Sequence, residues 1–303
     1  MILSAENLSY SYGARTLFEN VTFNVEEGDK YGIIGVNGTG KSTLLRMLAN
    51  HDAGEKGKLT IPGNVVMEYL PQDPPFDPEA TVLEQIFRGD SPLMVLLREY
   101  EMAIETATAC PDDKQAQKQL LELQQQMDEQ FAWQLESEAK AVLTQLGITR
   151  LQQKMGELSG GQRQRLLLAA TLAVHPEIIV LDEPVSAMDP DGAQSLYKLV
   201  WDIHQRYGTT IVAVEHRMDY LLPYVSDMVV LKNGELVAAD TFETAAPKMY
   251  EDAELRPLLP TLWQVKLGLE AKLHMDLGDW RSEADALADF KTFGIVAQEG
   301  RAD

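Results

Sequence analysis

Short apolar runs rich in β-branched residues recur along this chain, with helical patterns between several of them. The clearest runs are Tyr31–Ile34, Ile178–Leu181, Thr209–Val214 and Met228–Leu231. Strands that alternate with helices are typical of an α/β fold, and continuously apolar strands indicate a parallel sheet that is buried on both faces. The pattern therefore predicts a mostly parallel sheet core.

The first thirty residues follow a different pattern. The segments around Leu8–Tyr12 and Val21–Val25 alternate apolar and polar residues. Successive side chains of a strand point to opposite faces, so this alternation is typical of strands with one face in water. We expect an antiparallel β flank before the parallel core.

The strand signal disappears between Pro74 and Glu157. From Leu120 to Leu146, apolar residues follow one another at intervals of three or four positions, which predicts one long amphipathic helix. A shorter helix is expected around Leu93–Ile104, ahead of a turn at Cys110–Asp113. The two helices are expected to form a hairpin within an inserted helical subdomain.

These patterns divide the chain into a main domain over residues 1–240 and a C-terminal extension over residues 241–303. The helical subdomain is expected at about 74–175 and its hairpin at about 92–147. The extension is acidic and is expected to consist of helices and loops.

Composition and charge narrow the functional classes. The one cysteine, Cys110, cannot form an internal disulfide, and no leader resembling a signal peptide follows Met1, so we expect a cytoplasmic protein. No apolar run approaches the roughly 18 residues needed to span a bilayer, so a membrane role would require a partner. The formal net charge of -21 disfavours unaided binding to nucleic acid, and no direct DNA binding is expected.

A glycine-rich loop, Gly35–Ser42, follows the first predicted core strand and reads GVNGTGKS; the apolar helical segment Thr43–Leu48 comes next. This order of strand, loop and helix fits a phosphate-binding loop. Glycines let backbone N–H groups approach phosphates, the lysine adds positive charge, and the serine offers a magnesium ligand. The residues expected to bind ATP here are Gly35, Asn37, Gly38, Gly40, Lys41, Ser42 and Thr43.

Two acidic residues, Asp182 and Glu183, directly follow the apolar run Ile178–Leu181. Ligands bind at the carboxyl ends of the strands in a parallel sheet. Asp182 is expected to hold Mg²⁺, usually through a water molecule, and Glu183 is expected to polarise the attacking water as a general base. A solvated loop acid is the alternative for either residue alone, and the phosphate-binding loop disfavours it.

The segment Leu158–Gln162, which reads LSGGQ, narrows the family. With the loop and the two acids, it makes the chain similar to the ATP-binding cassette (ABC) family, which implies the P-loop NTPase (RecA-like) α/β fold. In that family the motif binds, from a helix N-terminus, the γ-phosphate held by an opposite subunit. The resemblance therefore implies a sandwich dimer, in which a partner's ATP site is completed by Ser159, Gly160, Gly161 and Gln162.

The resemblance also implies roles for residues outside these motifs. Gln72 matches the lid glutamine that senses magnesium and the attacking water, and His216 matches the switch histidine that contacts the γ-phosphate. Asp189 matches the acidic loop that touches the partner subunit. Tyr12 is expected to stack on adenine, with Tyr10 as the alternative. The implied catalytic residues are Glu183, His216 and Gln72, and the implied magnesium ligands are Ser42, Gln72 and Asp182.

The two halves of the chain resemble different branches of that family. Residues 1 to about 157 resemble the soluble ABC-F proteins that act on ribosomes, for example at Tyr69–Gln72. From about residue 158, the segments Asp182–Pro190 and Val214–Arg217 resemble the ATPases of energy-coupling-factor and cobalt-type importers. This pattern indicates a mosaic or a chimera joined at the signature motif.

Two functions follow from the resemblance. The second half favours an ATPase that energises an importer through a transmembrane partner subunit. The first half favours a soluble ABC-F-like factor on the ribosome, although residues 92–134 hold three basic and eight acidic residues, which opposes contact with RNA. Both functions imply ATP and Mg²⁺, and a homodimer or a second ABC ATPase subunit. A chromosome or repair ATPase would need a much longer coiled coil between loop and signature.

Overall fold

A central sheet organises the molecule. The computed structural model describes residues 1–292 except 55, 88–91, 131, 134–136, 138–139, 142, 145–146, 173–175, 187 and 217. Within these residues the sheet has the strand order β5-β6-β7-β3-β8-β9. Every neighbouring pair is parallel except β8 and β9, which confirms the predicted mostly parallel core. The strands are β3 (Lys30–Gly35), β5 (Met67–Leu70), β6 (Ile178–Asp182), β7 (Thr210–Val214), β8 (Asp227–Lys232) and β9 (Glu235–Thr241).

A second, antiparallel sheet flanks the core. It has the order β2-β1-β4 and consists of β1 (Leu3–Tyr12), β2 (Arg15–Val25) and β4 (Lys56–Thr60), which confirms the predicted β flank. The turn between β1 and β2 lies beside the glycine-rich loop, because Arg15 Nη2 is 3.3 Å from the carbonyl oxygen of Gly38.

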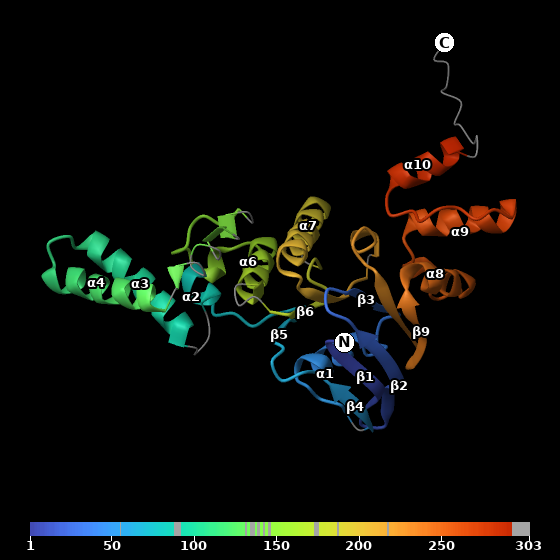
Figure 1. Cartoon of the computed structure of the whole chain (residues 1–303), viewed down its shortest axis with the longest axis horizontal. Coiled ribbons are helices and arrows are strands. Elements are labelled where there is room, and N and C mark those ends of the chain that lie inside the picture. Colours follow the sequence, from blue (N-terminus) through green and yellow to red (C-terminus); the bar gives the residue numbers. More distant parts are fainter. Residues whose placement is uncertain are drawn as a thin grey trace, which may run out of the picture.

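Helices cover both sides of the sheet and extend from it at two ends (Figure 1). The α3–α4 hairpin and the C-terminal helices α9 and α10 lie at opposite ends of the long axis. The helices of the main domain are α1 (Lys41–Ala49), α2 (Val82–Ile86), α3 (Pro92–Ala109), α4 (Lys114–Glu129), α6 (Gly160–Leu172) and α7 (Pro190–Tyr207), with short 3-10 turns at Met155–Glu157 and Met218–Tyr220. None of the helices in the described part of the chain is long and apolar enough to cross a membrane.

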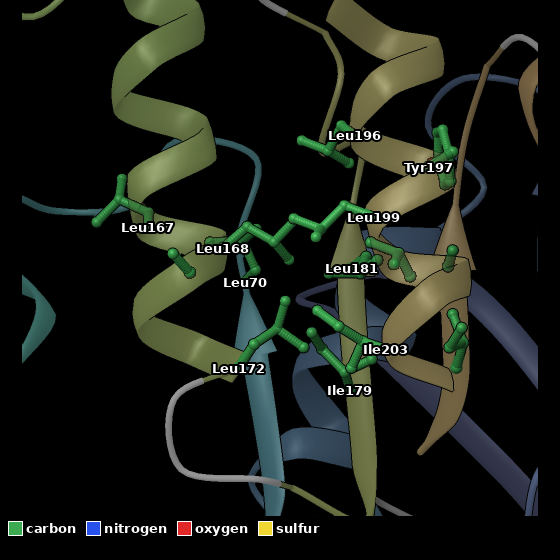
Figure 2. Packing of buried hydrophobic residues seen from close by; sticks show 14 of the residues in the cluster. Leu70, Leu167, Leu168, Leu172, Ile179, Leu181, Leu196, Tyr197, Leu199 and Ile203 are labelled. Carbon is green, nitrogen blue, oxygen red and sulfur yellow. The ribbon is translucent and has the colours of Figure 1, made fainter. Parts of the chain in front are cut away.

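Alternate residues of the buried strands face two separate apolar cores. Ile179 and Leu181 of β6 belong to a core shared with α6 and α7, whereas Ile178 and Val180 belong to a core shared with α1 and the β flank. Figure 2 shows the first of these cores, where leucines of α6 and α7 gather around β6. A strand that is apolar at every position is therefore buried on both faces, as its sequence predicts. Consequently α1 and α6 lie on opposite faces of the sheet.

The single long helix predicted from Leu120 to Leu146 is wrong. Helix α4 ends at Glu129, and the N–H group of Ala132 then donates to the carbonyl oxygen of Met127 at 3.0 Å. This bond spans five residues and interrupts the i to i−4 ladder of the helix. Of the apolar residues at the predicted spacing, Leu123 and Met127 are buried, and Phe131, Leu135, Ala139, Val142 and Leu146 lie outside the described residues. Apolar periodicity reports burial, and it does not require an unbroken backbone helix.

The C-terminal extension packs against the main domain. It contains α8 (Phe242–Glu251), a 3-10 turn at Arg256–Leu258, α9 (Thr261–Leu273) and α10 (Glu283–Thr292), as the expectation of helices and loops requires. The guanidinium group of Arg281 donates to the carbonyl oxygens of Leu222 and Val225 at 3.2 and 2.7 Å. These bonds connect the extension to the segment between β7 and β8.

Candidate active site

The glycine-rich loop joins the end of β3 to the start of α1, and its glycines are sterically required. A Cβ on Gly35 would lie 2.3 Å from the carbonyl oxygen of Leu231, so no larger residue fits without a backbone shift. Gly38 and Gly40 have φ angles of 80° and 87°, in the left-handed region that favours glycine. The loop is therefore a fixed turn that leads directly into the N-terminus of α1.

Lys41 is buried at the first position of α1. Its Nζ donates to the carbonyl oxygens of Gly35 and Val36, at 2.8 and 3.2 Å, so the loop itself holds the ammonium group. Burial lowers the pKa of Lys41, and the nearby carboxylates of Glu183 and Asp182 act in the opposite direction. This places a positive charge at the helix N-terminus, close to both acids.

Ser42 and Asp182 meet although 140 residues separate them in the sequence. Ser42 Oγ donates to Asp182 Oδ1 at 3.0 Å, and Tyr69 Oη donates to Asp182 Oδ2 at 3.1 Å. Burial and the neighbouring Asp182 raise the pKa of Tyr69 above its usual range. Two hard oxygen donors at the loop are the kind of ligand that Mg²⁺ takes, so Ser42 and Asp182 fit this cation.

Glu183 lies between Gln72 and His216. Gln72 Nε2 donates to one carboxylate oxygen of Glu183 at 3.0 Å, and His216 Nε2 lies 2.7 Å from the other. Glu183 has a left-handed φ of 49°, and its N–H group donates to the carbonyl oxygen of Val214 at 2.9 Å. The chain thus turns sharply after β6 and presents this carboxylate between the two polar side chains. Gln72 contacts Glu183, and among the described residues Ser42 and Asp182 are the two expected magnesium ligands that a hydrogen bond joins.

The signature residues form a separate local arrangement at the start of α6. Ser159 N donates to Gln162 Oε1 at 3.0 Å, and Gln162 N donates to Ser159 Oγ at 3.2 Å, which is a reciprocal capping box. Two glycines follow Ser159. A Cβ built on the second, Gly161, would lie 3.7 Å from Met188 Cγ. Among the described residues, no hydrogen bond connects this cap to the phosphate loop of the same chain.

The other predicted binding residues lie at the edges of the site. Asp189 caps α7, where its Oδ1 accepts from the N–H of Gly192 at 2.7 Å. Tyr12 is 77% exposed at the tip of the β flank, whereas Tyr10 stacks on Phe18 inside the flank, so only Tyr12 is free to meet a base. The exposed Asn37 and the half-buried Thr43 lie on and just after the loop.

Two residues at the site were not singled out by the sequence analysis. Tyr69 precedes Leu70 on β5, and only the pairing of β5 with β6 brings its hydroxyl to Asp182. Arg15 contacts the loop because the β flank folds over it. No local motif signals either residue, since each depends on a neighbour that is distant in the sequence.

A family model described as ABC transporter matches residues 18–186. The chain belongs to this family. Hydrolysis of ATP is the general activity of its ATP-binding domains. The ABC protein resembles, with a TM-score of 0.61 and 25% identity, the crystal structure of the ADP conformation of an ATP-binding cassette of an ABC transporter, over 85% of this chain and 97% of that one. The predicted P-loop NTPase fold is thereby confirmed.

Two curated relatives of the ABC protein are matched over very different shares of their own length. It is 38% identical over 235 residues to the uncharacterized ABC transporter ATP-binding protein YfmR of Bacillus subtilis, which covers 78% of this chain and 37% of YfmR. It is 29% identical over 265 residues to the energy-coupling factor transporter ATP-binding protein EcfA1 of Oenococcus oeni, which covers 84% of this chain and 83% of EcfA1. The chain spans about a third of the length of the first curated relatives that it matches.

Proposed function

We propose that this chain binds and hydrolyses ATP at composite sites between two ABC cassettes. The observation that carries the proposal is the position of Glu183, whose carboxylate contacts both Gln72 and His216 beside the Ser42–Asp182 pair. A carboxylate between two polar side chains, next to a phosphate-binding loop, suits a general base that takes a proton from water.

Binding of the triphosphate depends on the loop and on the start of α1. Loop N–H groups and the helix N-terminus offer positive potential to the phosphates. Lys41 exchanges its two carbonyl partners for phosphate oxygens and brings its charge to the β- and γ-phosphates. Ser42 and Asp182 hold Mg²⁺, which when bound offsets the negative charge on the phosphate oxygens. Tyr12 stacks on the adenine.

Hydrolysis then uses the three side chains around the end of β6. Glu183 accepts a proton from the attacking water while the water oxygen bonds to the γ-phosphorus and ADP leaves. Gln72 orients the water, and His216 contacts the γ-phosphate. Both side chains also hold the carboxylate of Glu183 in place, through the contacts of 3.0 and 2.7 Å.

The site needs a second cassette. Within one chain, α6 and α1 lie on opposite faces of the sheet, and among the described residues no hydrogen bond joins the signature cap to its own phosphate loop. A second copy, or a second ABC ATPase subunit, supplies Ser159, Gly160 and Gly161 to the γ-phosphate from the N-terminus of its α6. Asp189, at the start of α7, contacts the partner.

We favour import across a membrane as the process that this ATP hydrolysis drives. EcfA1 of Oenococcus oeni is matched over 83% of its length, which supports a single cassette of importer type. The segments Asp182–Pro190 and Val214–Arg217 carry the same resemblance. A transmembrane partner subunit would hold this cytoplasmic protein at the inner face of the membrane. The matches to YfmR and EcfA1, of 235 and 265 residues, are each long enough to include residue 157, so each relative matches parts of both halves. A mosaic origin stays a prediction.

The α3–α4 hairpin favours a second candidate, a soluble factor acting on the ribosome. The hairpin extends from the main domain at one end of the molecule, where a large partner can reach it (Figure 1). Its acidic side chains outnumber its basic ones, which weakens contact with RNA phosphates. For this reason the ribosome stays the second choice.

Trapping the ATP-bound state separates these possibilities. We expect Glu183→Gln to lower kcat by at least about 100-fold while ATP still induces dimers, because the base is lost and the phosphate contacts remain. In a cell extract with ATP, the variant should sediment with membranes, and Lys41→Ala serves as the control that cannot be trapped. Hydrolysis at the parent rate would disprove the assignment of the base. Sedimentation with ribosomes would select the second candidate, and sedimentation with neither would exclude both partners.

A further inference from the structure

A buried carboxylate, Glu215, lies behind the site and takes no part in the mechanism above. It follows β7 directly and is 5% exposed. Its Oε1 accepts a hydrogen bond from Tyr197 Oη at 2.7 Å, and the backbone N–H groups of Val185 and His216 lie near enough to its carboxylate to lower its pKa. One side chain thus joins three segments that are distant in the sequence.

Each of these segments carries part of the proposed active site. Val185 lies two residues after Glu183, in the turn that presents the base. The N–H group of His216 belongs to the switch histidine itself, whose ring lies 2.7 Å from Glu183. Tyr197 belongs to α7, the helix that Asp189 caps, and its side chain is buried.

The contacts of Glu215 partly offset the cost of burying a carboxylate. Burial raises the pKa of its carboxyl to about 7, against the effect of the Tyr197 hydroxyl and of the backbone N–H groups of Val185 and His216, which favour the charged form. Without this carboxylate, the buried hydroxyl of Tyr197 would lose its acceptor, which is costly, and the N–H groups of Val185 and His216 would lose a nearby negative charge. An apolar residue here could fill the space, and it could not hold these three donors in a fixed arrangement.

We infer that Glu215 and Tyr197 are positioning residues, which hold the turn after β6 and the backbone of the switch histidine against α7 and thereby fix the contact between Glu183 and His216. This inference rests on the proposed ATP hydrolysis. Neither residue touches the nucleotide, so they act only through Glu183 and His216. Because α7 starts at the partner-facing loop, the same contacts connect that loop to the base.

The test compares the kinetics of two single variants, their double variant and one control variant of the full chain. Tyr197→Phe removes one hydroxyl, and Glu215→Gln removes one acceptor oxygen while keeping the shape. We expect each to lower kcat about tenfold or more with KM for ATP changed less than about twofold, since small displacements of catalytic groups are costly and the phosphate loop is untouched. The effects should also be less than additive in the double variant. Tyr31→Phe is the matched control, because it removes a hydroxyl bonded at 2.6 Å to the carbonyl oxygen of Asn24, outside the site.

A spectroscopic readout keeps the inference independent of turnover. The imidazole N–H proton of His216, assigned by its loss in His216→Asn, should give a downfield resonance in the wild type and in Tyr31→Phe. We expect this resonance to be lost or broadened in Tyr197→Phe and Glu215→Gln. Wild-type kcat in both variants, or an unchanged resonance, would overturn the positioning role. A wild-type protein without ATPase activity but with the expected resonance changes would refute the proposed hydrolysis and leave the positioning role supported.

Discussion

Replacing Glu215 by glutamine should change how the stability of the protein depends on pH. Burial raises the pKa of Glu215 from 4.5 to about 7. Below pH 4.5 the carboxyl is protonated in both the folded and the unfolded chain, so its contribution to stability is fully present. Between pH 4.5 and about 7 the unfolded chain releases a proton that the folded chain retains, so stability is lost as the pH rises through the folded pKa.

The size of this loss follows from the shift in pKa. At about 1.4 kcal/mol per pH unit, the shift of Glu215 corresponds to about 3 kcal/mol, without a discount for screening because the side chain is buried. Glutamine does not titrate, so the free energy of unfolding of Glu215→Gln minus that of the wild type should rise by about 3 kcal/mol between pH 4.5 and 7.5.

Urea unfolding followed by tryptophan fluorescence, to which the buried Trp263 and Trp280 contribute, measures this difference at each pH. Other titrating groups, such as Glu68, whose pKa is also raised by burial, are common to both proteins and cancel in the difference. If the difference in unfolding free energy stays constant within about 1 kcal/mol over this range, Glu215 has an ordinary pKa in the folded protein and the reasoning is refuted.

Three further predictions concern the phosphate loop and the stacking of Tyr12 on adenine. Lys41→Ala should weaken ATP binding at least about tenfold by calorimetry, since it removes a charge aimed at the phosphates, and an unchanged affinity would count against that role. Gly35→Ala should lower the free energy of unfolding by about 1–3 kcal/mol, because a Cβ would lie 2.3 Å from the carbonyl oxygen of Leu231; an unchanged urea midpoint would contradict this steric argument. Tyr12→Ala should raise the Kd for ATP severalfold and leave the melting temperature unchanged, because the side chain is exposed, whereas Tyr10→Ala, as the comparison, should lower the melting temperature.

The convergence of the main site residues could be predicted because it depends on a general property of parallel sheets. The carboxyl ends of parallel strands meet at one edge, so any order of β3, β5, β6 and β7 brings the loop, Gln72, Glu183 and His216 to that edge. The observed order β5-β6-β7 then places Glu183 between the other two side chains. The sequence could not give this order, and it could not give the register that brings Tyr69 to Asp182.

The break in the predicted long helix has a related cause. The predicted apolar stripe coincides with burial at Leu123 and Met127 of α4, and buried residues on both sides of the break, Met127 and Leu143, belong to the same core. The hydrogen bond from the N–H group of Ala132 to the carbonyl oxygen of Met127 changes the path of the backbone, and the spacing of apolar residues does not report such a change. Patterns of burial therefore predicted the elements better than they predicted where a helix stops.

By itself the sequence determined the α/β class, the phosphate loop and the two acids after β6, because each depends on residues that are contiguous in the chain. Only the tertiary structure decided that Tyr12 rather than Tyr10 is exposed, that Lys41 is held by its own loop, and that Glu215 joins three segments through Tyr197. The first depends on which side of the β flank is covered, the second on how the loop turns back on itself over five or six residues, and the third on a contact between residues 18 positions apart. Strand order, register and packing determine such contacts, and a local pattern of residues does not contain them.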